Sequence, residues 1–303
     1  NLGYEVIYNE DGATIKRPYQ TKTLIIESYS QLDYQGAIGV AEGYKNIHVF
    51  QYETEYETYL ALKYYESLDC VTSVFADSYF YVDEIVETNE NQEIEIDGLN
   101  DTFSYMTWGY KTFAVKEYAN YLNNAVTSAK QKEVIVAVLD TGIDTDHSMF
   151  VNRLVRGGKD FTGNTSSTSG FPYEDGHSHG THVSGTIVDL TESNVKILPV
   201  KVLSDSGKGV GLSVTNGCEY VLELADSMPN IKVVNMSLGA EDVAVGSYSQ
   251  IYYKERIDNL YNANIISVVA AGNEERDVSM ICPANIETAI TVSAIDEDWE
   301  FAY

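Results

Sequence analysis

Two patterns of hydrophobic and polar positions divide the chain, and the first covers residues 22–83. Short β-branched and aromatic runs there have the length of strands, and the last one places aromatic residues at alternating positions. The strands predicted from these runs are Thr23–Glu27, Ile47–Tyr52 and Val71–Val82. Helical spacing predicts a helix over Tyr56–Ser67, and a second is predicted over Gln31–Tyr44 despite its internal glycines. This region is therefore expected to form a small α/β unit.

From about Ser104 the pattern changes to apolar strands that alternate with helical segments. Glu133–Leu139 is a continuous apolar run, of the kind that is buried on both faces of a sheet. The further predicted strands are Lys196–Val202, Ile231–Met236, Ile265–Val269 and Ala289–Ile295. The predicted helices are Phe113–Ala125, Gly180–Leu190, Leu212–Ser227 and Tyr248–Ala263. The alternation predicts a parallel sheet with helices on both faces, in which functional groups gather where strands end.

The boundary between the two regions is an acidic segment, Asp83–Asp101, which is expected to be an exposed linker. The chain of 303 residues is long enough for two domains. We therefore expect one domain over residues 1–103 and a second over residues 104–303.

Charge and composition exclude several classes of function. The formal net charge is −27, which would repel nucleic acids and anionic membrane surfaces. We expect this charge to favour solubility, and a preference for cationic substrates is the alternative. The apolar runs are too short to span a membrane, and three cysteines are too few for a disulfide framework.

Asp140 is the first candidate for chemistry, because it ends the apolar run in VAVLDTGID. A carboxylate in this position lies where parallel sheets build sites. The turn at Thr141 and Gly142 could donate backbone N–H groups that keep it ionised. The alternative is an ordinary turn or helix-capping aspartate.

A cluster of histidines in GHSHGTHVSGT is the second candidate. His179 would begin a helix, where a neutral imidazole is favoured and can act as a base. The competing interpretation is a metal site. Its ligands would be His177, His179 and His182 with Asp175 or His147, although no downstream His or Cys set completes it.

Asn273, in the segment AAGNE after an apolar strand, is the third candidate. Its side-chain amide is a neutral N–H donor that could stabilise an oxyanion. Gly-Asn after a strand is also a common turn.

Four strings, VLDTGID, HGTHVSGTI, NMSLG and VVAAGN, occur in this order and resemble the signatures of the subtilase family of serine proteases. The resemblance runs from about Trp108 to the end. It implies a subtilisin-like parallel sheet with flanking helices, and a serine endopeptidase with an Asp/His/Ser triad. By this resemblance Asp140 orients His179, His179 is the general base, Asn273 is the oxyanion donor and His182 is structural. The residues that the resemblance assigns to substrate binding are Gly207, Gly209, Ser237, Leu238, Gly239, Ala270 and Gly272.

The nucleophile is missing from this pattern, because the sequence holds no G-T-S-M-A-type string for the family's serine. We expect that the chain stops before that serine and is inactive as given. The alternative is an inactive subtilase-like pseudoprotease that binds peptides.

The N-terminal region resembles a subtilase propeptide in size, position and pattern, which implies a small α+β, ferredoxin-like domain bound in cis to the catalytic domain. The junction is expected between Asp97 and Trp108. A third hypothesis makes this region an independent inhibitor beside a vestigial catalytic part. The family resemblance implies a secreted or cell-surface protein.

No cofactor is expected. Calcium is possible, but Met149 stands where many secreted family members have an aspartate ligand. The calcium loop that usually follows the histidine helix also looks deleted, because Thr191–Val200 runs almost directly into the next strand.

Overall fold

The structure is a computed structural model, and its description covers most of both predicted regions. The described residues are 6–9, 12–15, 20–43, 46–82, 132–163, 171–241, 243, 246–273, 275–296, 298 and 300–301. Three predictions lie outside them: the acidic linker after residue 82, the helix Phe113–Ala125, and the domain boundary at residue 103.

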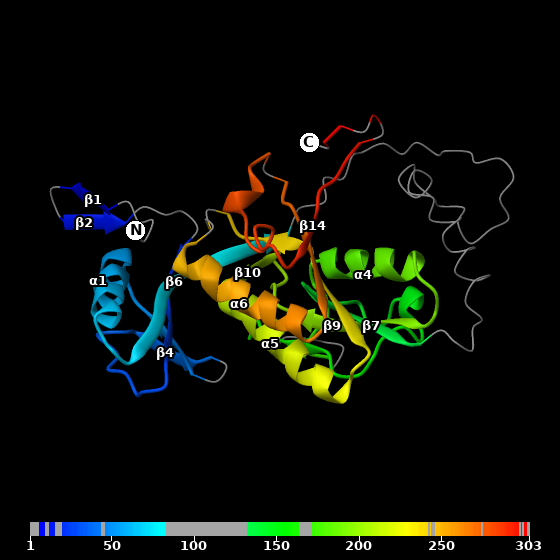
Figure 1. Cartoon of the computed structure of the whole chain (residues 1–303), viewed down its shortest axis with the longest axis horizontal. Coiled ribbons are helices and arrows are strands. Elements are labelled where there is room, and N and C mark those ends of the chain that lie inside the picture. Colours follow the sequence, from blue (N-terminus) through cyan, green and yellow to red (C-terminus); the bar gives the residue numbers. More distant parts are fainter. Residues whose placement is uncertain are drawn as a thin grey trace, which may run out of the picture.

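The N-terminal unit is an antiparallel sheet with one helix, α1 (Glu55–Glu66), on its face (Figure 1). A separate hairpin, β1 (Val6–Asn9) with β2 (Gly12–Ile15), precedes it. The remaining strands of the unit are β3 (Gln20–Ser28), β4 (Gly39–Glu42), β5 (Ile47–Gln51) and β6 (Val71–Val82).

Both faces of β3 are buried, which explains its unbroken apolar run. Leu24 and Ile26 pack with residues of α1, such as Leu62, in one cluster. Ile25 points to the opposite face and joins the core of the C-terminal region. Since side chains alternate across a strand, three consecutive apolar residues in β3 serve two separate cores.

The predicted helix over residues 31–44 is wrong. The chain forms a loop there and then the edge strand β4, which pairs with β5 in the register Gly39↔Gln51 to Glu42↔His48. Gln35 and Gly36 have φ angles of +46° and +80°, which a right-handed helix cannot contain. Within residues 20–43 and 46–82 the unit therefore has one helix, α1, where two were predicted from the sequence.

The C-terminal region is built on six parallel strands in the order β14-β13-β11-β7-β9-β8, which confirms the predicted parallel sheet. Their bounds are β7 (Val134–Asp140), β8 (Lys159–Asp160), β9 (Val195–Lys201), β11 (Ile231–Met236), β13 (Ile266–Ala270) and β14 (Ile290–Val292). The helices are α4 (His179–Asp189), α5 (Gly211–Ser227) and α6 (Tyr248–Asn262), with short 3-10 turns η2 (Ser148–Phe150) and η3 (Val278–Met280). Within the described ranges, none of the helices has the length and apolar character needed to cross a membrane.

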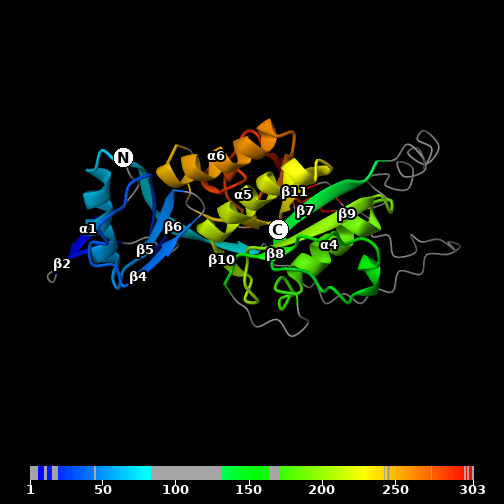
Figure 2. The same ribbon diagram turned by 90° about the horizontal axis from the view of Figure 1, so that it is seen from below.

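The sheet separates two cores. Ile135, Ala137 and Leu139 of β7 face the cluster that includes residues of α5 and α6. Val136 and Val138 face the other side, where they pack with residues of α4. Figure 2 shows α4 on one side of the strands and α5 and α6 on the other. This arrangement accounts for the continuous apolar run predicted as a doubly buried strand.

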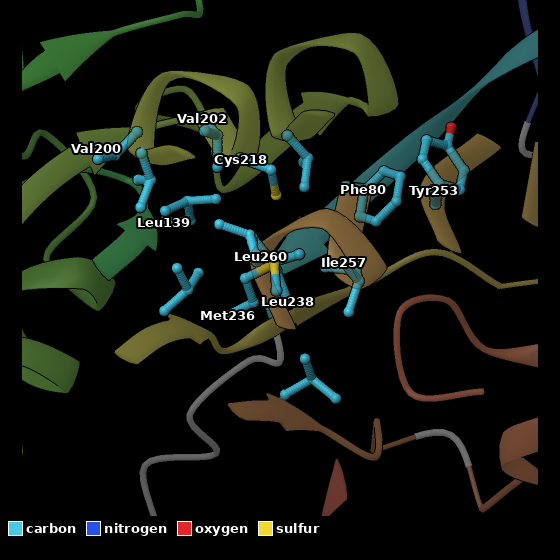
Figure 3. Packing of buried hydrophobic residues seen from close by; sticks show 14 of the residues in the cluster. Phe80, Leu139, Val200, Val202, Cys218, Met236, Leu238, Tyr253, Ile257 and Leu260 are labelled. Carbon is cyan, nitrogen blue, oxygen red and sulfur yellow. The ribbon is translucent and has the colours of Figure 1, made fainter. Parts of the chain in front are cut away.

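Strand β6 joins the two regions. Its last residues pair antiparallel with β10 (Lys208–Val210) on one side and β12 (Leu238–Gly239) on the other. Phe80 of β6 meets Tyr253 of α6 edge-on, with ring centroids 5.3 Å apart, and Figure 3 shows both rings within one cluster. The N-terminal unit and the parallel-sheet region therefore share a hydrophobic core.

Asp77 is a buried carboxylate at this junction, 2% exposed. Its Oδ1 accepts a bond from Ser78 N–H at 2.8 Å, and its Oδ2 accepts one from Leu212 N–H at 3.4 Å. Helix α5 begins at Gly211 without a capping bond from the side chain of Val210. A carboxyl group of the N-terminal unit thus provides an acceptor for the first turn of a helix in the other region.

We expect Asp77→Asn to reduce the pH dependence of stability. Burial raises the pKa of Asp77 to about 7, although hydrogen bonds from Ser78, Leu212 and Tyr253 oppose the rise. Because this pKa is higher in the folded chain, its contribution is complete below about pH 4 and is lost as the pH rises through about 7, a loss on the order of 4 kcal/mol. Asparagine keeps an acceptor oxygen and stays neutral.

Urea unfolding at about pH 4 and about pH 8 measures this effect. The stability difference between the two pH values should shrink in Asp77→Asn. It should stay at the parental value in the control Asp69→Asn, whose side chain is exposed. An equal difference in all three proteins would contradict the assignment.

Candidate active site

Asp140 is the last residue of β7 and is fully buried. Its Oδ1 accepts a hydrogen bond from Thr141 N–H at 2.7 Å. The chain then turns at Gly142, where φ is +116° and a Cβ would clash with Tyr173 O. Glycine at this position therefore lets the backbone turn back against the carboxylate.

His179 is the first residue of α4 and is 4% exposed. Its Nδ1 lies 2.7 Å from Asp140 Oδ1. A Cβ at Gly180 would clash with Gly142 O, so glycine lets the start of α4 lie directly against the end of β7. The two motifs singled out from the sequence therefore lie in direct contact in the structure.

The chemistry of this pair follows from the donor and acceptor types. A carboxylate only accepts, so Nδ1 carries the proton in this contact, and the neutral ring keeps Nε2 as its basic nitrogen. A buried imidazole oriented by a carboxylate can take a proton from a nucleophile and return it to a leaving group. Asp140 and His179 in this arrangement can therefore perform general acid–base catalysis.

The other histidines do not complete a metal site. The ring of His177 lies 6.3 Å from that of His179 between centroids, the side chain of His182 is exposed, and His147 accepts a bond from Met149 N–H. No group of three or more His, Cys, Asp or Glu side chains in the described ranges could hold a metal ion. The predicted alternative of His177, His179 and His182 as joint ligands is therefore not supported by their placement.

Met149 does not fit the calcium ion that the family resemblance makes possible. It lies in η2, and its Sδ would be 3.3 Å from a Cβ at Gly185. Calcium takes hard oxygen ligands, whereas a thioether is a soft ligand. The side chain of Met149 therefore does not supply a ligand for that calcium site.

Three of the predicted substrate-binding residues lie on the two strands that enclose β6, and a fourth, Gly207, directly precedes β10. Gly209 pairs with Phe80, Leu238 with Val82 and Gly239 with Tyr81. Gly207, with φ at +71°, accepts a bond from Val82 N–H at 3.0 Å. The backbones of β10 and β12 thus hold an extended strand between them, and that strand is β6 of the same chain. The end of β6 therefore lies between the two segments that the family resemblance assigns to substrate binding.

The other predicted residues lie at the carboxyl ends of β11 and β13. Ser237 follows β11 and is partly buried, Ala270 ends β13, and Gly272 has a φ of +97°. Asn273 comes next and is exposed. Because β7, β11 and β13 are parallel, these residues lie at the same edge of the sheet as Asp140.

Sequence analysis missed two polar residues that surround the pair. Asp175, considered there only as a metal ligand, accepts hydrogen bonds from the turn after β7 and from the start of α4. Lys201, 2% exposed, pairs in register with Asp140 and donates its Nζ to Thr141 O and to Asp205 at 2.8 Å. A charged residue inside the predicted strand Lys196–Val202 was the available signal for Lys201.

Comparisons with known proteins find relatives in sequence and in fold. A model of the subtilase family matches residues 131–301. A cuticle-degrading serine protease of Arthrobotrys oligospora is 34% identical over 231 residues, which are 72% of this chain and 52% of that protein. Subtilisin E of Bacillus subtilis is 36% identical over 174 residues, 54% of this chain and 41% of the relative. The chain thus spans about half the length, or less, of these curated relatives.

The crystal structure of the epidermin leader peptide processing serine protease from Staphylococcus aureus superposes with a TM-score of 0.62. The superposed residues make up 93% of this chain and 71% of the chain of the Staphylococcus aureus protease, and the sequence identity is 15%. At this identity the likeness supports the fold alone, and it includes the N-terminal unit.

Proposed function

The chain belongs to the subtilase family of serine proteases, and from this we propose that it is part of a subtilisin-type serine endopeptidase in its precursor form. The observation that carries the proposal is the buried contact of 2.7 Å between His179 Nδ1 and Asp140 Oδ1. The third member of the triad would be a serine outside these 303 residues, because no G-T-S-M-A-type string occurs within them.

In the proposed reaction, His179 Nε2 takes the proton of the serine hydroxyl as the oxygen attacks the carbonyl carbon of the peptide bond. Asp140 stabilises the imidazolium that forms, and the imidazolium then protonates the leaving amine. Water hydrolyses the resulting acyl-enzyme, with His179 again as the base. Asn273 would donate its amide N–H to the oxyanion of each tetrahedral intermediate.

Extended peptides are the proposed substrates, because β10 and β12 hold β6 by antiparallel strand pairing. In this mode of recognition backbone bonds supply affinity and alternate side chains supply specificity. Phe80 and Val82 are buried, with exposed fractions of 1% and 8%, whereas Tyr79 is exposed. A substrate would present its side chains at the same alternating positions.

We further propose that residues 1–103 are a propeptide that inhibits the enzyme in cis. The pairing of β6 with both edge strands supports this, since a substrate and β6 cannot occupy the same backbone groups. The name of the cuticle-degrading relative denotes action on an extracellular material, and on that ground a secreted or cell-surface location is proposed for this protein too.

Maturation of the full-length gene product tests both proposals. Hydrolysis of an added peptide should begin only as mass spectrometry shows the N-terminal unit being cut off and removed. New N-termini between residues 97 and 108 would support the junction predicted from sequence. Full activity in uncut protein would contradict the inhibitory role, and no activity after removal of the unit would contradict the protease.

Asn273→Ala is expected to lower kcat of the mature full-length enzyme by roughly 10²- to 10³-fold with little change in KM, as for loss of one oxyanion donor. The amide acts on charge that develops only in the transition state, so substrate binding is nearly unaffected. Steady-state kinetics measure kcat and KM separately. Asn264→Ala, in an exposed turn before β13, is the control. A parental kcat in Asn273→Ala would remove this residue from the mechanism.

A further inference from the structure

Asp175 accepts five hydrogen bonds with one carboxylate. Its Oδ1 accepts from Thr141 Oγ1, His177 N–H and Ser178 N–H, each at 2.9 Å. Its Oδ2 accepts from Thr181 N–H at 2.9 Å and from Thr181 Oγ1 at 2.6 Å. Thr141 follows Asp140 directly, and the other four donor groups belong to three residues that flank His179 in sequence. One side chain therefore binds both segments that carry the catalytic pair.

Thr141 connects this carboxylate to Asp140. Its N–H donates to Asp140 Oδ1 at 2.7 Å, while its hydroxyl donates to Asp175 and accepts from Gly180 N–H at 2.9 Å. Its carbonyl accepts from Lys201 Nζ. Thr141 is fully buried, and each of its polar groups has a partner, so its position is fixed from several directions.

The start of α4 depends on Asp175 because its own cap is incomplete. Ser178 has a left-handed φ of +82° and its side chain makes no capping bond. Asp175 and Thr141 instead accept the N–H groups of Thr181 and Gly180, which a helix leaves without internal partners. Burial opposes ionisation of Asp175, but the bonds from Thr181, His177 and Thr141 outweigh it and hold the pKa of this carboxyl below its ordinary value. The carboxylate form also suits the positive end of the helix.

We propose that Asp175 is a positioning residue that fixes the first turn of α4 against the turn after β7 and thereby sets the contact between His179 and Asp140. Its consequence for catalysis rests on the proposed protease function. Its consequence for geometry does not, because the pair is formed in this chain without the serine.

The matched variants are Asp175→Asn and Glu174→Gln. An amide in place of Asp175 turns one acceptor oxygen into a donor that faces N–H and O–H groups, so at least one side of the network is lost. Glu174 is the neighbouring carboxylate, and it binds Thr145 N–H at 3.2 Å and the Thr145 hydroxyl at 2.9 Å. Its replacement removes the same charge without touching Thr141 or Thr181.

Proton NMR of the 303-residue chain with ¹⁵N-labelled histidine measures the geometry. The parent and Glu174→Gln should show the downfield Nδ1–H signal of His179 hydrogen-bonded to a carboxylate. In Asp175→Asn this signal should be lost or broadened by exchange with water. An unchanged signal in a folded Asp175→Asn protein overturns the proposal.

If Asp175→Asn does not fold, the pair Thr141→Val and Thr141→Ser carries the same test. Valine removes the hydroxyl that joins Asp175 to Gly180 N–H, and serine retains it. The signal should be lost with valine and kept with serine, and equal spectra in the two variants overturn the proposal.

Kinetics of the mature full-length protein give the catalytic consequence. Asp175→Asn should lower kcat about 10- to 100-fold with KM nearly unchanged, because a small displacement of a catalytic group costs rate rather than binding. A rise in KM with kcat unchanged would overturn the positioning role. An inactive parent would count against the protease function and leave the NMR result standing.

Discussion

His179→Ala should lower kcat/KM of the mature full-length enzyme by roughly 10⁵- to 10⁶-fold, the largest effect expected of any substitution here. In the proposed mechanism the imidazole is the general base in acylation and the general acid for the leaving amine, so its loss affects every proton transfer. Alanine leaves a cavity in place of a side chain that is 4% exposed. The far-UV circular dichroism spectrum of the variant must therefore show that it is folded when its rate is measured.

His182→Ala is the matched control, since His182 lies in the same helix with an exposed side chain. Its kcat/KM should stay within a few-fold of the parent. If His182→Ala lost as much activity as His179→Ala, or if His179→Ala remained active, the assignment of the base would be wrong.

Asp140→Asn should lower kcat by roughly 10⁴-fold while KM changes little. The amide can present an N–H to His179 Nδ1, which would then be held as the acceptor, with the proton on Nε2. The ring could no longer take the proton of the nucleophile. Steady-state kinetics at neutral pH measure the effect.

The control for Asp140→Asn is Asp146→Asn in the exposed turn that follows. This substitution removes the same charge near the site without altering the contact at Oδ1 of Asp140. A kcat for Asp140→Asn close to that of Asp146→Asn would sink the role given to the buried carboxylate.

The two residues of the proposed catalytic pair could be singled out from the sequence because each lies in a recognisable local pattern. Asp140 ends a continuous apolar run, and His179 begins a helix between glycines. In a parallel sheet the ends of strands and the starts of the following helices meet at one edge, so both motifs were expected there. The structure joins them through one hydrogen bond.

Residues 31–43 show where local pattern was insufficient. The choice between a helix and an edge strand there depends on Gln35 and Gly36 at positive φ and on backbone pairing of β4 with β5. The φ angles are local backbone features and the pairing is a tertiary one, and neither leaves a periodic signal in the side chains. Glycines inside the predicted helix were the available warning.

The contacts of Asp175 and Asp77 were beyond sequence analysis for a related reason. Most of their hydrogen-bond donors are backbone N–H groups, which every residue except proline provides. The pairing of β6 with β10 and β12 is likewise made by backbone groups from distant parts of the chain. Nothing in the side-chain pattern marks such partners.

The most direct test of the account is labelling of the full-length gene product with a fluorophosphonate probe, followed by mass spectrometry of the modified peptide. The account predicts one labelled serine in a segment after Tyr303, with labelling abolished in His179→Ala and retained in His182→Ala. A folded, mature protein that takes no label, or takes it equally in His179→Ala, would contradict the serine protease and favour a cleft that only binds peptides.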